Sequence, residues 1–320
     1  KISAVMACFL MLTGCIVHMN NINIPAAIQP LEEHVLSGEG GDKILMMDIS
    51  GSITDQGKKG MFSSSLSPVA RIKEELDKAA SDSAVRAVIL RINSPGGTVT
   101  ASDMIYNELL SFKRKTNKKI IVSITNLGAS GAYYIAMAAD RIFVHPTTVT
   151  GSIGVIMVSM NASGLLEKIG VSGHAIKSGE HKDMGSPFRP MTEEDRMLFQ
   201  EIIDEMYARF VDVVEGGRPN LSRDEILRAA DGRVYTGQQA LELGLVDEVG
   251  YIENAIESAK ARARIKNARV VRYIRPGEYK ENIYAGIPGG KPTVNLINLD
   301  MGSLVEAGVP QFLYMWLPNN

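Results

Sequence analysis

The chain has 320 residues, of which 45% are hydrophobic, 22% charged and 6% aromatic. This composition is typical of a folded globular protein and excludes a disordered, collagen-like or multi-pass membrane chain. The 34 Lys and Arg residues are balanced by 36 Asp and Glu residues, for a formal charge of -2, so a nucleic-acid partner is disfavoured.

The chain begins with a short apolar segment. Residues 2–17 contain no charge, follow Lys1, and are too few for a spanning helix of about 20 apolar residues, but they suit a signal peptide. Leu-Thr-Gly-Cys at 12–15 resembles a bacterial lipoprotein box, with Cys15 as the lipidated residue. We therefore expect residues 1–15 to be a signal peptide with a lipobox or, alternatively, an uncleaved anchor. Both place the chain at the cell membrane, on its extracytoplasmic face.

The next segment and the body that follows it differ in composition. Residues 18–42 are polar and rich in Gly, Pro and Asn, which predicts a flexible stalk over 16–42. Over 43–260, buried-type apolar runs alternate with amphipathic segments, which predicts an α/β domain with parallel strands and crossover helices. Strands are expected at 43–49, 85–92, 119–124 and 141–144, and helices at 68–80 (capped by Ser67), 101–115 and 130–139.

The chain becomes mainly helical after residue 190. A helix is expected from its N-cap Thr192 to about residue 215, and another over 252–264. A hydroxyl residue followed three positions on by Glu or Gln, at 222–225 and 236–239, matches the capping box and predicts two more helix starts. Residues 261–320 are a C-terminal extension of unknown role, whose last stretch is expected to be mobile or separately docked.

Small residues at 128–132 predict a sharp turn from a strand into a helix, with Ser130 at the helix N-terminus. Such turns lie at the carboxyl edge of a parallel sheet, and the helix N-terminus favours a developing oxyanion. The glycine pair at 96–97 follows the preceding strand, and the Gly97 N–H is the predicted oxyanion donor. The alternatives are that Ser130 is an ordinary helix cap and that the glycines only form a turn.

The base that would activate Ser130 is not obvious from the residues alone. His145, His174 and His181 lie in the body, and a polar loop holds Lys177 and Lys182. A lysine is a general base only when neutral, which requires its pKa to fall by about 3 from about 10.4. The default for a lysine in a loop is a solvated charge.

Five motifs in order settle the choice by resemblance. They are Pro-Gly-Gly at 95–97, Gly-Ala-Ser-Gly-Ala-Tyr-Tyr-Ile-Ala at 128–136, Thr-Gly-Ser-Ile-Gly-Val-Ile at 150–156, Lys-Ser-Gly-x-x-Lys-Asp at 177–183 and Asp-Gly-Arg-Val-Tyr-Thr-Gly-x-x-Ala-x-x-Leu-Gly-Leu-Val-Asp at 231–247. Together they resemble the bacterial signal peptide peptidase family of Ser-Lys proteases, in its short single-copy form. The resemblance covers the predicted body and implies a ClpP/crotonase-like fold.

The resemblance implies a role for each matching residue. Ser130 would be the nucleophile and Lys182 the general base. Ser152 would orient Lys182 by a hydrogen bond, and the Gly97 N–H, with that of Gly131, would form the oxyanion hole. No metal or organic cofactor is implied.

The resemblance also implies a membrane-tethered serine endopeptidase that degrades cleaved signal peptides and other unfolded peptides, as a homo-oligomer. One alternative is an enoyl-CoA hydratase-like enzyme of the related fold, which would need an acidic base and a CoA site. Another is a non-catalytic membrane scaffold. A third keeps proteolysis but uses His181 or His145 as the base.

Overall fold

The computed structural model describes residues 29–57, 66–276 and 311–317. The predicted signal peptide or anchor, residues 1–15, and the first part of the predicted stalk, 16–28, lie outside the described residues. None of the helices within the described ranges combines the length and the hydrophobicity that crossing a bilayer requires.

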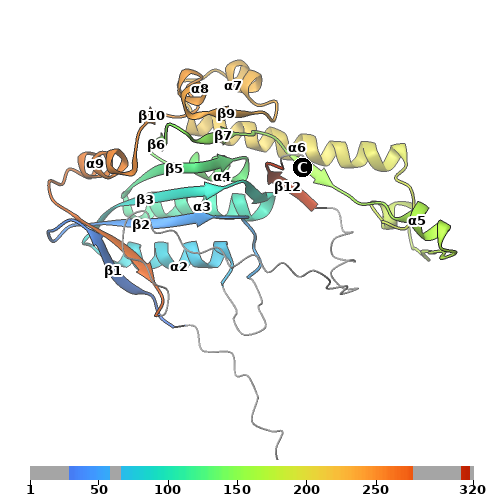
Figure 1. Cartoon of the computed structure of the whole chain (residues 1–320), viewed down its shortest axis with the longest axis horizontal. Helices are drawn as coiled ribbons and strands as arrows, with labels where there is room; N and C mark the ends of the chain where they lie inside the picture. Colours follow the sequence, from blue (N-terminus) through green and yellow to red (C-terminus); the bar gives the residue numbers. More distant parts are fainter. Residues whose placement is uncertain (1–28, 58–65, 277–310, 318–320) are drawn as a thin grey trace, which may run out of the picture.

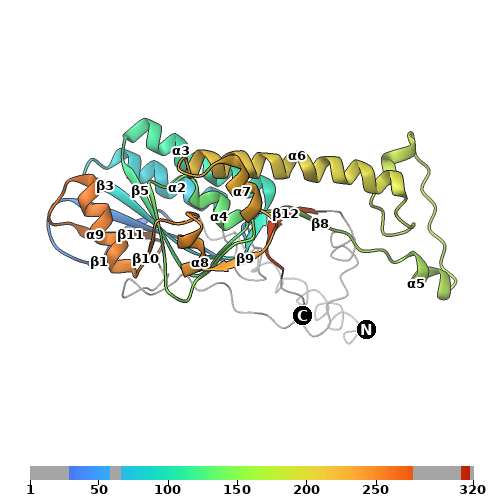
Figure 2. The same ribbon diagram turned by 90° about the horizontal axis from the view of Figure 1, so that it is seen from above.

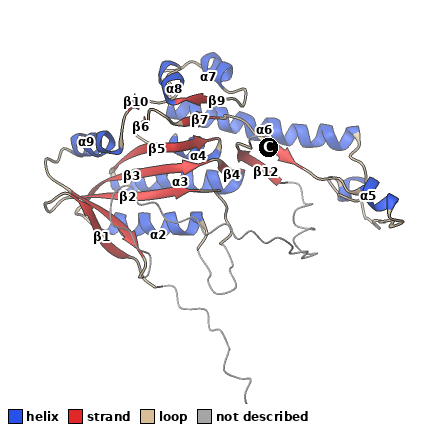
Figure 3. Ribbon diagram, viewed as in Figure 1, coloured by secondary structure: helices blue, strands red, loops and turns tan. Residues whose placement is uncertain are grey.

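A mostly parallel sheet forms the centre of the molecule (Figures 1 and 3). Its strands are β1 (Glu32–Ser37), β2 (Lys43–Ser50), β3 (Val85–Ser94), β5 (Lys119–Ala129), β6 (Arg141–Val144), β7 (Val149–Gly151), β9 (Val234–Thr236), β10 (Glu248–Val249) and β11 (Arg269–Ile274). Among the described residues the order is β1-β11-β2-β3-β5-β6-β10, with β7 beside β5 and β9 beside β7. Only the β1–β11 and β7–β9 pairs of this described sheet are antiparallel, so the predicted α/β fold is confirmed.

Helices cover both faces of this sheet, because its central strands are apolar on both sides. Along β2, Leu45 and Met47 pack towards α2 (Pro68–Ser81), α3 (Val99–Thr116) and α4 (Gly131–Ala136). The alternate residues Ile44 and Met46 pack towards α9 (Ile252–Ala263) on the other face. The carboxyl ends of β3 and β5 are therefore held between two packed layers.

The predicted helix caps are confirmed. Ser67 accepts a hydrogen bond from the Ala70 N–H at the start of α2. Thr192 forms a capping box with Asp195 at the start of α6 (Glu193–Gly217). The boxes predicted at 222–225 and 236–239 begin α7 (Arg223–Ala229) and α8 (Gly237–Glu242).

A second, small sheet lies beside the carboxyl end of β3. The strands β4 (Gly96–Thr98) and β8 (Ile156–Val158) flank the C-terminal strand β12 (Gln311–Met315), which is antiparallel to both. Residues from the first and third of the five motifs and from the far end of the chain therefore share one sheet.

An arm, residues 159–192, projects away from the body (Figures 1 and 2). It carries α5 (Ser163–Lys168) and a 3-10 turn, η1 (Glu180–Asp183), neither of which has a buried residue. The long helix α6 runs from the tip of the arm back to the body (Figure 2).

The predicted domain boundaries need correction at both ends. The prediction that residues 16–42 form a flexible stalk is wrong for residues 32–37, because they form β1, which pairs with β11 as an edge strand of the main sheet. The boundary at residue 260 is wrong as well, because β11 lies inside that sheet, parallel to β2. Residues 277–310 of the predicted C-terminal extension lie outside the described residues.

A buried ion cluster fixes β11 in place. Asp48 on β2 is 1% exposed and accepts hydrogen bonds from Arg91 on β3 (2.9 and 3.1 Å) and from Arg272 on β11. A buried carboxylate needs such partners, so the sheet requires the strand that carries Arg272.

Candidate active site

Ser130 lies at the turn between β5 and α4 in an unusual backbone conformation. Its φ is 53° and its ψ is -116°, a combination that side-chain-bearing residues rarely adopt. The turn is held by a hydrogen bond from the Ser130 N–H to the Gly151 carbonyl (2.7 Å). The Ser130 side chain, 1% exposed by residue, makes no capping hydrogen bond to α4, so the helix-cap alternative is wrong.

Ser152 reaches the same place from the neighbouring strand. Ala129 pairs with Gly151 in the β5–β7 register, so Ser130 and Ser152 each follow one member of that pair. Ser152 also has a positive φ, of 51°, and its N–H donates to the Arg233 carbonyl (2.7 Å). Two serines with left-handed backbones thus stand side by side at the carboxyl edge of the sheet.

The glycines predicted to line the site are required by close backbone contacts. A Cβ on Gly97 would stand 1.8 Å from the Ile53 carbonyl oxygen, and Gly96 has a φ of 101°. A Cβ on Gly96 would also stand 2.8 Å from the Gly131 nitrogen. The glycine pair therefore does more than make a turn: it brings the backbone of β4 against the residue that follows Ser130.

The C-terminal strand lies directly on these glycines. In the β12–β4 register Tyr314 is opposite Gly97, and the Trp316 N–H donates to the carbonyl of the residue before Gly96 (2.9 Å). Because hydrogen-bonded pairs alternate along an antiparallel ladder, the Gly97 N–H faces the Tyr314 carbonyl. That oxygen lies 2.0 Å from the point where a Gly96 Cβ would stand and 3.0 Å from the corresponding point on Gly131. The Tyr314 carbonyl therefore lies against the backbone of Gly96, Gly97 and Gly131.

Lys182 is not brought to this site within the chain. It lies on η1 in the arm with its side chain exposed, and no hydrogen bond between described residues joins it to Ser130. Its neighbour Asp183 is held by other cations, Arg189 (3.0 Å) and Lys177 (2.8 Å). Hydrogen bonds from Arg189, which have the larger effect, and from Lys177 lower the pKa of Asp183 to about 2. The Asp183 carboxylate therefore stabilises the conformation of this loop.

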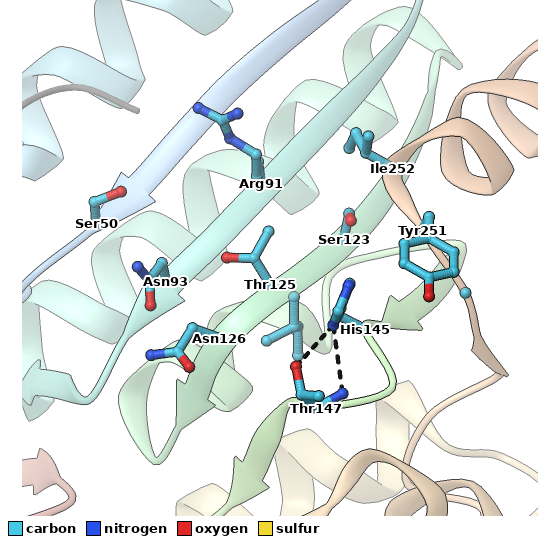
Figure 4. Close-up of a pocket in the computed structure, with 12 residues that line it drawn as sticks. Ser50, Arg91, Asn93, Ser123, Thr125, Asn126, His145, Thr147, Tyr251 and Ile252 are labelled. Carbon is cyan, nitrogen blue, oxygen red and sulfur yellow. Dashed lines mark hydrogen bonds between the residues drawn. The ribbon is translucent and has the colours of Figure 1, made fainter. Parts of the chain in front are cut away.

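The two histidines considered as alternative bases lie elsewhere. His181 is on the same exposed turn as Lys182, 3.7 Å from the Glu194 carboxylate. His145 lines a cavity of about 380 Å³ together with Asn93, Thr125 and Asn126 (Figure 4), and its Nδ1 lies 2.9 Å from the Thr147 hydroxyl. None of the four predicted site residues lines that cavity.

Sequence reasoning missed the part of the site made by β12. The run Gln-Phe-Leu-Tyr-Met at 311–315 is apolar and short enough for a strand, but its partner strands lie far earlier in the chain. In the part of the chain that the structure describes, no group of three or more His, Cys, Asp or Glu side chains is arranged to hold a metal ion.

Two protein-family models match the chain. The family model "Peptidase family S49" matches residues 112–266, which include Ser130, Ser152 and Lys182. The model "Clp protease" matches residues 68–150, which include Gly97, and agrees with a ClpP/crotonase-like α/β fold.

Named relatives cover most of the chain. One from Enterococcus faecium, named as a signal peptide peptidase SppA, is 41% identical over 76% of this chain and 70% of its own length. Protease 4 of Haemophilus influenzae is 36% identical over 68% of this chain and 34% of its own length. The chloroplastic serine protease SPPA of Arabidopsis thaliana is 34% identical over 78% of this chain and 37% of its own length.

Proposed function

The chain belongs to peptidase family S49 and is a serine protease by that membership, and from this premise we propose that it is an endopeptidase with a Ser-Lys dyad. Ser130 is the proposed nucleophile and Lys182 the proposed general base. Ser152 orients the lysine, and the Gly97 and Gly131 N–H groups form the oxyanion hole.

The observation that carries the proposal is the position of the Tyr314 carbonyl. It lies against Gly96, Gly97 and Gly131, next to the residue Ser130. A peptide bond bound in this way presents its carbonyl oxygen to backbone N–H groups and its carbon to the serine hydroxyl. This is the arrangement that acyl transfer to serine needs.

The proposed reaction follows from these contacts. The neutral Lys182 amine accepts the Ser130 hydroxyl proton as Oγ bonds to the carbonyl carbon. The oxygen becomes an oxyanion that accepts hydrogen bonds from Gly97 and Gly131. The lysine then gives its proton to the leaving amine as the C–N bond breaks. A water molecule, deprotonated by the same lysine, hydrolyses the acyl-enzyme.

We propose that the base at each Ser130 comes from a second copy of the chain. The arm that carries Lys182 projects from its own body and exposes many large apolar side chains, a pattern typical of an interaction surface. The exposed apolar side chains of the arm include Met160 (60% exposed), Leu165 (64%), Ile169 (63%), Val171 (49%) and Ile176 (105%). Burial against another copy would cover these side chains and favour the neutral form of the Lys182 amine.

Complementation between inactive variants tests this arrangement. Ser130→Ala and Lys182→Ala are each expected to abolish peptide hydrolysis. When the two are co-expressed, copies that retain Lys182 can serve copies that retain Ser130, and random mixing restores about a quarter of wild-type activity. The control is a chain that carries both substitutions, expressed alone. A mixture as inactive as the double variant would contradict a base supplied by a second copy.

Labelling of the nucleophile tests the peptidase assignment itself. A fluorophosphonate is expected to modify Ser130, faster as the pH rises because the base must be uncharged. Lys182→Ala is expected to slow the labelling, whereas His181→Ala and His145→Ala leave it unchanged. A hydratase or a scaffold would leave Ser130 unlabelled, and full labelling of Lys182→Ala would refute the dyad.

The remaining parts of the proposal concern substrate and place. We propose that the substrates are cleaved signal peptides and other unfolded peptides, and that the enzyme is held on the extracytoplasmic face of the cell membrane by residues 1–15. Incorporation of labelled palmitate that is lost in Cys15→Ser would support lipidation. A membrane-bound wild-type protein that incorporates no label would favour an uncleaved anchor.

A further inference from the structure

The face of the main sheet that α9 covers changes from apolar to polar along its strands. Side chains two residues apart on a strand share one face. Met46 of β2, Ile89 of β3 and Ile121 of β5 are register partners on this face and belong to the apolar cluster that packs against α9. Two residues further along the same strands, the row consists of Asp48, Arg91 and Ser123. The faces of a parallel sheet are normally apolar, so this change needs an explanation.

The polar part of this face lines the cavity of about 380 Å³ beside His145, which we call the His145 cavity (Figure 4). Ser123 lines it from β5 and is 4% exposed, and its hydroxyl makes no hydrogen bond to any residue that the structure describes. Asn93 and Asn126 line one end of the cavity with exposed side chains. A buried hydroxyl without a partner is costly, so the Ser123 hydroxyl is suited to bind an occupant of the cavity.

His145 also offers a hydrogen-bond donor at the cavity. Its Nδ1 lies 2.9 Å from the Thr147 hydroxyl and accepts a hydrogen bond from the Thr147 N–H (3.3 Å). A neutral imidazole whose Nδ1 accepts carries its hydrogen on Nε2. Figure 4 shows this Nε2 on the side of the ring away from Thr147. The Nε2–H group is therefore available to an acceptor in the cavity.

The charges around the cavity favour an anion. Arg91 and His145 line it, whereas no Asp or Glu is among the described residues that do so. The Asp48 carboxylate behind Arg91 also accepts from Arg272, so that cluster of two guanidinium groups and one carboxylate carries one net positive charge. The 12-residue helix α9 begins at the cavity, which residues 250–252 line, and the positive end of its dipole adds to this potential.

We propose that the His145 cavity binds the carboxyl-terminal residue of a peptide. The carboxylate accepts hydrogen bonds from Ser123 and His145, and the side chain packs on Tyr251 and Ile252. The choice of a peptide rests on the proposed peptidase function, because every cut leaves a fragment with a new carboxylate. A cavity of about 380 Å³ is small for a ligand site and suits about one or two residues at the end of a chain.

The alternative is that the polar row only extends the buried ion cluster and that water fills the cavity. Under that alternative the affinity for a peptide does not depend on its terminal group. Under our proposal the affinity depends on the free carboxylate, and it depends on the side chains that line this cavity.

Calorimetric titration of the full-length Ser130→Ala protein tests the proposal without hydrolysis. The probes are N-acetyl-Ala-Leu with a free carboxylate and the same dipeptide as its amide, in a buffer free of phosphate and acetate. We expect the acid to bind about ten- to 100-fold more tightly than the amide, as hydrogen bonds to a charged group warrant. Equal affinities, or no detectable binding of either probe, would overturn the proposal.

A substitution at the cavity shows whether the acid is bound there. Asn126→Asp adds a negative charge with little change in shape, so the acid should bind about tenfold more weakly and the amide as before. The matched control is Asn107→Asp, which is exposed on α3, over the other face of the sheet, and should alter neither affinity. If the acid binds equally well to both variants, it is bound elsewhere and the proposal is wrong.

Inorganic phosphate tests whether the occupant is a peptide or only a small anion. Phosphate that binds the wild-type cavity, and not Asn126→Asp, while the acid dipeptide does not bind would overturn the peptide assignment.

Fluorophosphonate labelling of the wild type separates the two levels of inference. If Ser130 is labelled but the acid and the amide bind alike, the cavity inference fails and the peptidase function stands. If Ser130 is unlabelled while Asn126→Asp still weakens binding of the acid, the proposed function fails and the carboxylate site stands.

Discussion

Replacing Ser130, the proposed nucleophile, first by alanine and then by glycine measures the strain stored in its backbone. Its φ of 53° and ψ of -116° are sterically costly for any residue with a Cβ. Backbone strain of this kind amounts to about 1–3 kcal/mol. Glycine relieves it, because it has no Cβ.

The expected change follows from three contributions. An Ala-to-Gly substitution at a buried site loses about 0.8 kcal/mol of methyl burial and about 0.7 kcal/mol of backbone entropy. At position 130 the relief of about 2 kcal/mol offsets that loss, so Ser130→Gly should be about 0.5 kcal/mol more stable than Ser130→Ala. Ala255, which is 0% exposed within α9, has no such relief. Ala255→Gly should therefore cost about 1.5 kcal/mol.

Urea unfolding at equilibrium gives the free energy of unfolding for the four proteins: Ser130→Ala, Ser130→Gly, wild type and Ala255→Gly. The Ala-to-Gly change in unfolding free energy is compared between positions 130 and 255, and the two changes should differ by about 2 kcal/mol. Equal losses at positions 130 and 255 would refute the claim that the serine is held in a strained backbone.

Two further predictions concern stability. Burial, partly offset by the neighbouring Arg71, raises the pKa of Glu75 from 4.5 to about 7, so folding favours its protonated form and stability falls as the pH rises between those values. Glu75→Gln removes this dependence: its unfolding free energy relative to wild type should rise by about 3 kcal/mol from pH 5 to pH 8, and parallel pH curves would contradict the assignment. Asp48→Ala removes the carboxylate between two buried guanidinium groups and should cost about 3–5 kcal/mol in urea unfolding. The exposed partner of Arg86, Asp42, is the control; its alanine variant should change stability by less than about 1 kcal/mol, and an equal loss at both positions would argue against the buried cluster.

Much of the central sheet is predictable because its strands are buried on both faces. A mainly apolar run such as 85–92 is stable in a globular fold when both of its faces are buried, as in a central strand of a parallel sheet. β1 has no such run: its sequence is Glu-Glu-His-Val-Leu-Ser, and its residues are mostly exposed. It is a strand only because β11, more than 200 residues later, offers a free edge.

Helix ends were less predictable than helix starts. The helix predicted over 130–139 begins one residue later and ends at Ala136, because Met137 and the two residues after it donate to carbonyls three positions back and tighten the last turn. Hydroxyl caps identify starts through a local hydrogen bond, whereas this ending depends on the surrounding packing.

The residues of the candidate site also differ in whether the sequence predicts their position. Gly97, Ser130 and Ser152 converge because each follows a strand whose carboxyl end meets the same sheet edge. Lys182 follows no strand of that sheet, so no rule of local geometry places it. Tyr134 and Phe210 are spaced as ordinary core aromatics, and nothing in that spacing predicts that Tyr314 of β12 packs against both rings.

The exposed arm has a consequence for how the enzyme behaves in dilute solution. Under the proposed function, each chain holds its nucleophile on the body and its general base on the arm, so a single chain is half of a catalytic apparatus. Specific activity should then fall with dilution, as partners separate, and return on concentration without any covalent change. Confining the chains to a two-dimensional surface raises their effective concentration. Partners would then stay together at a copy number too low for assembly in free solution.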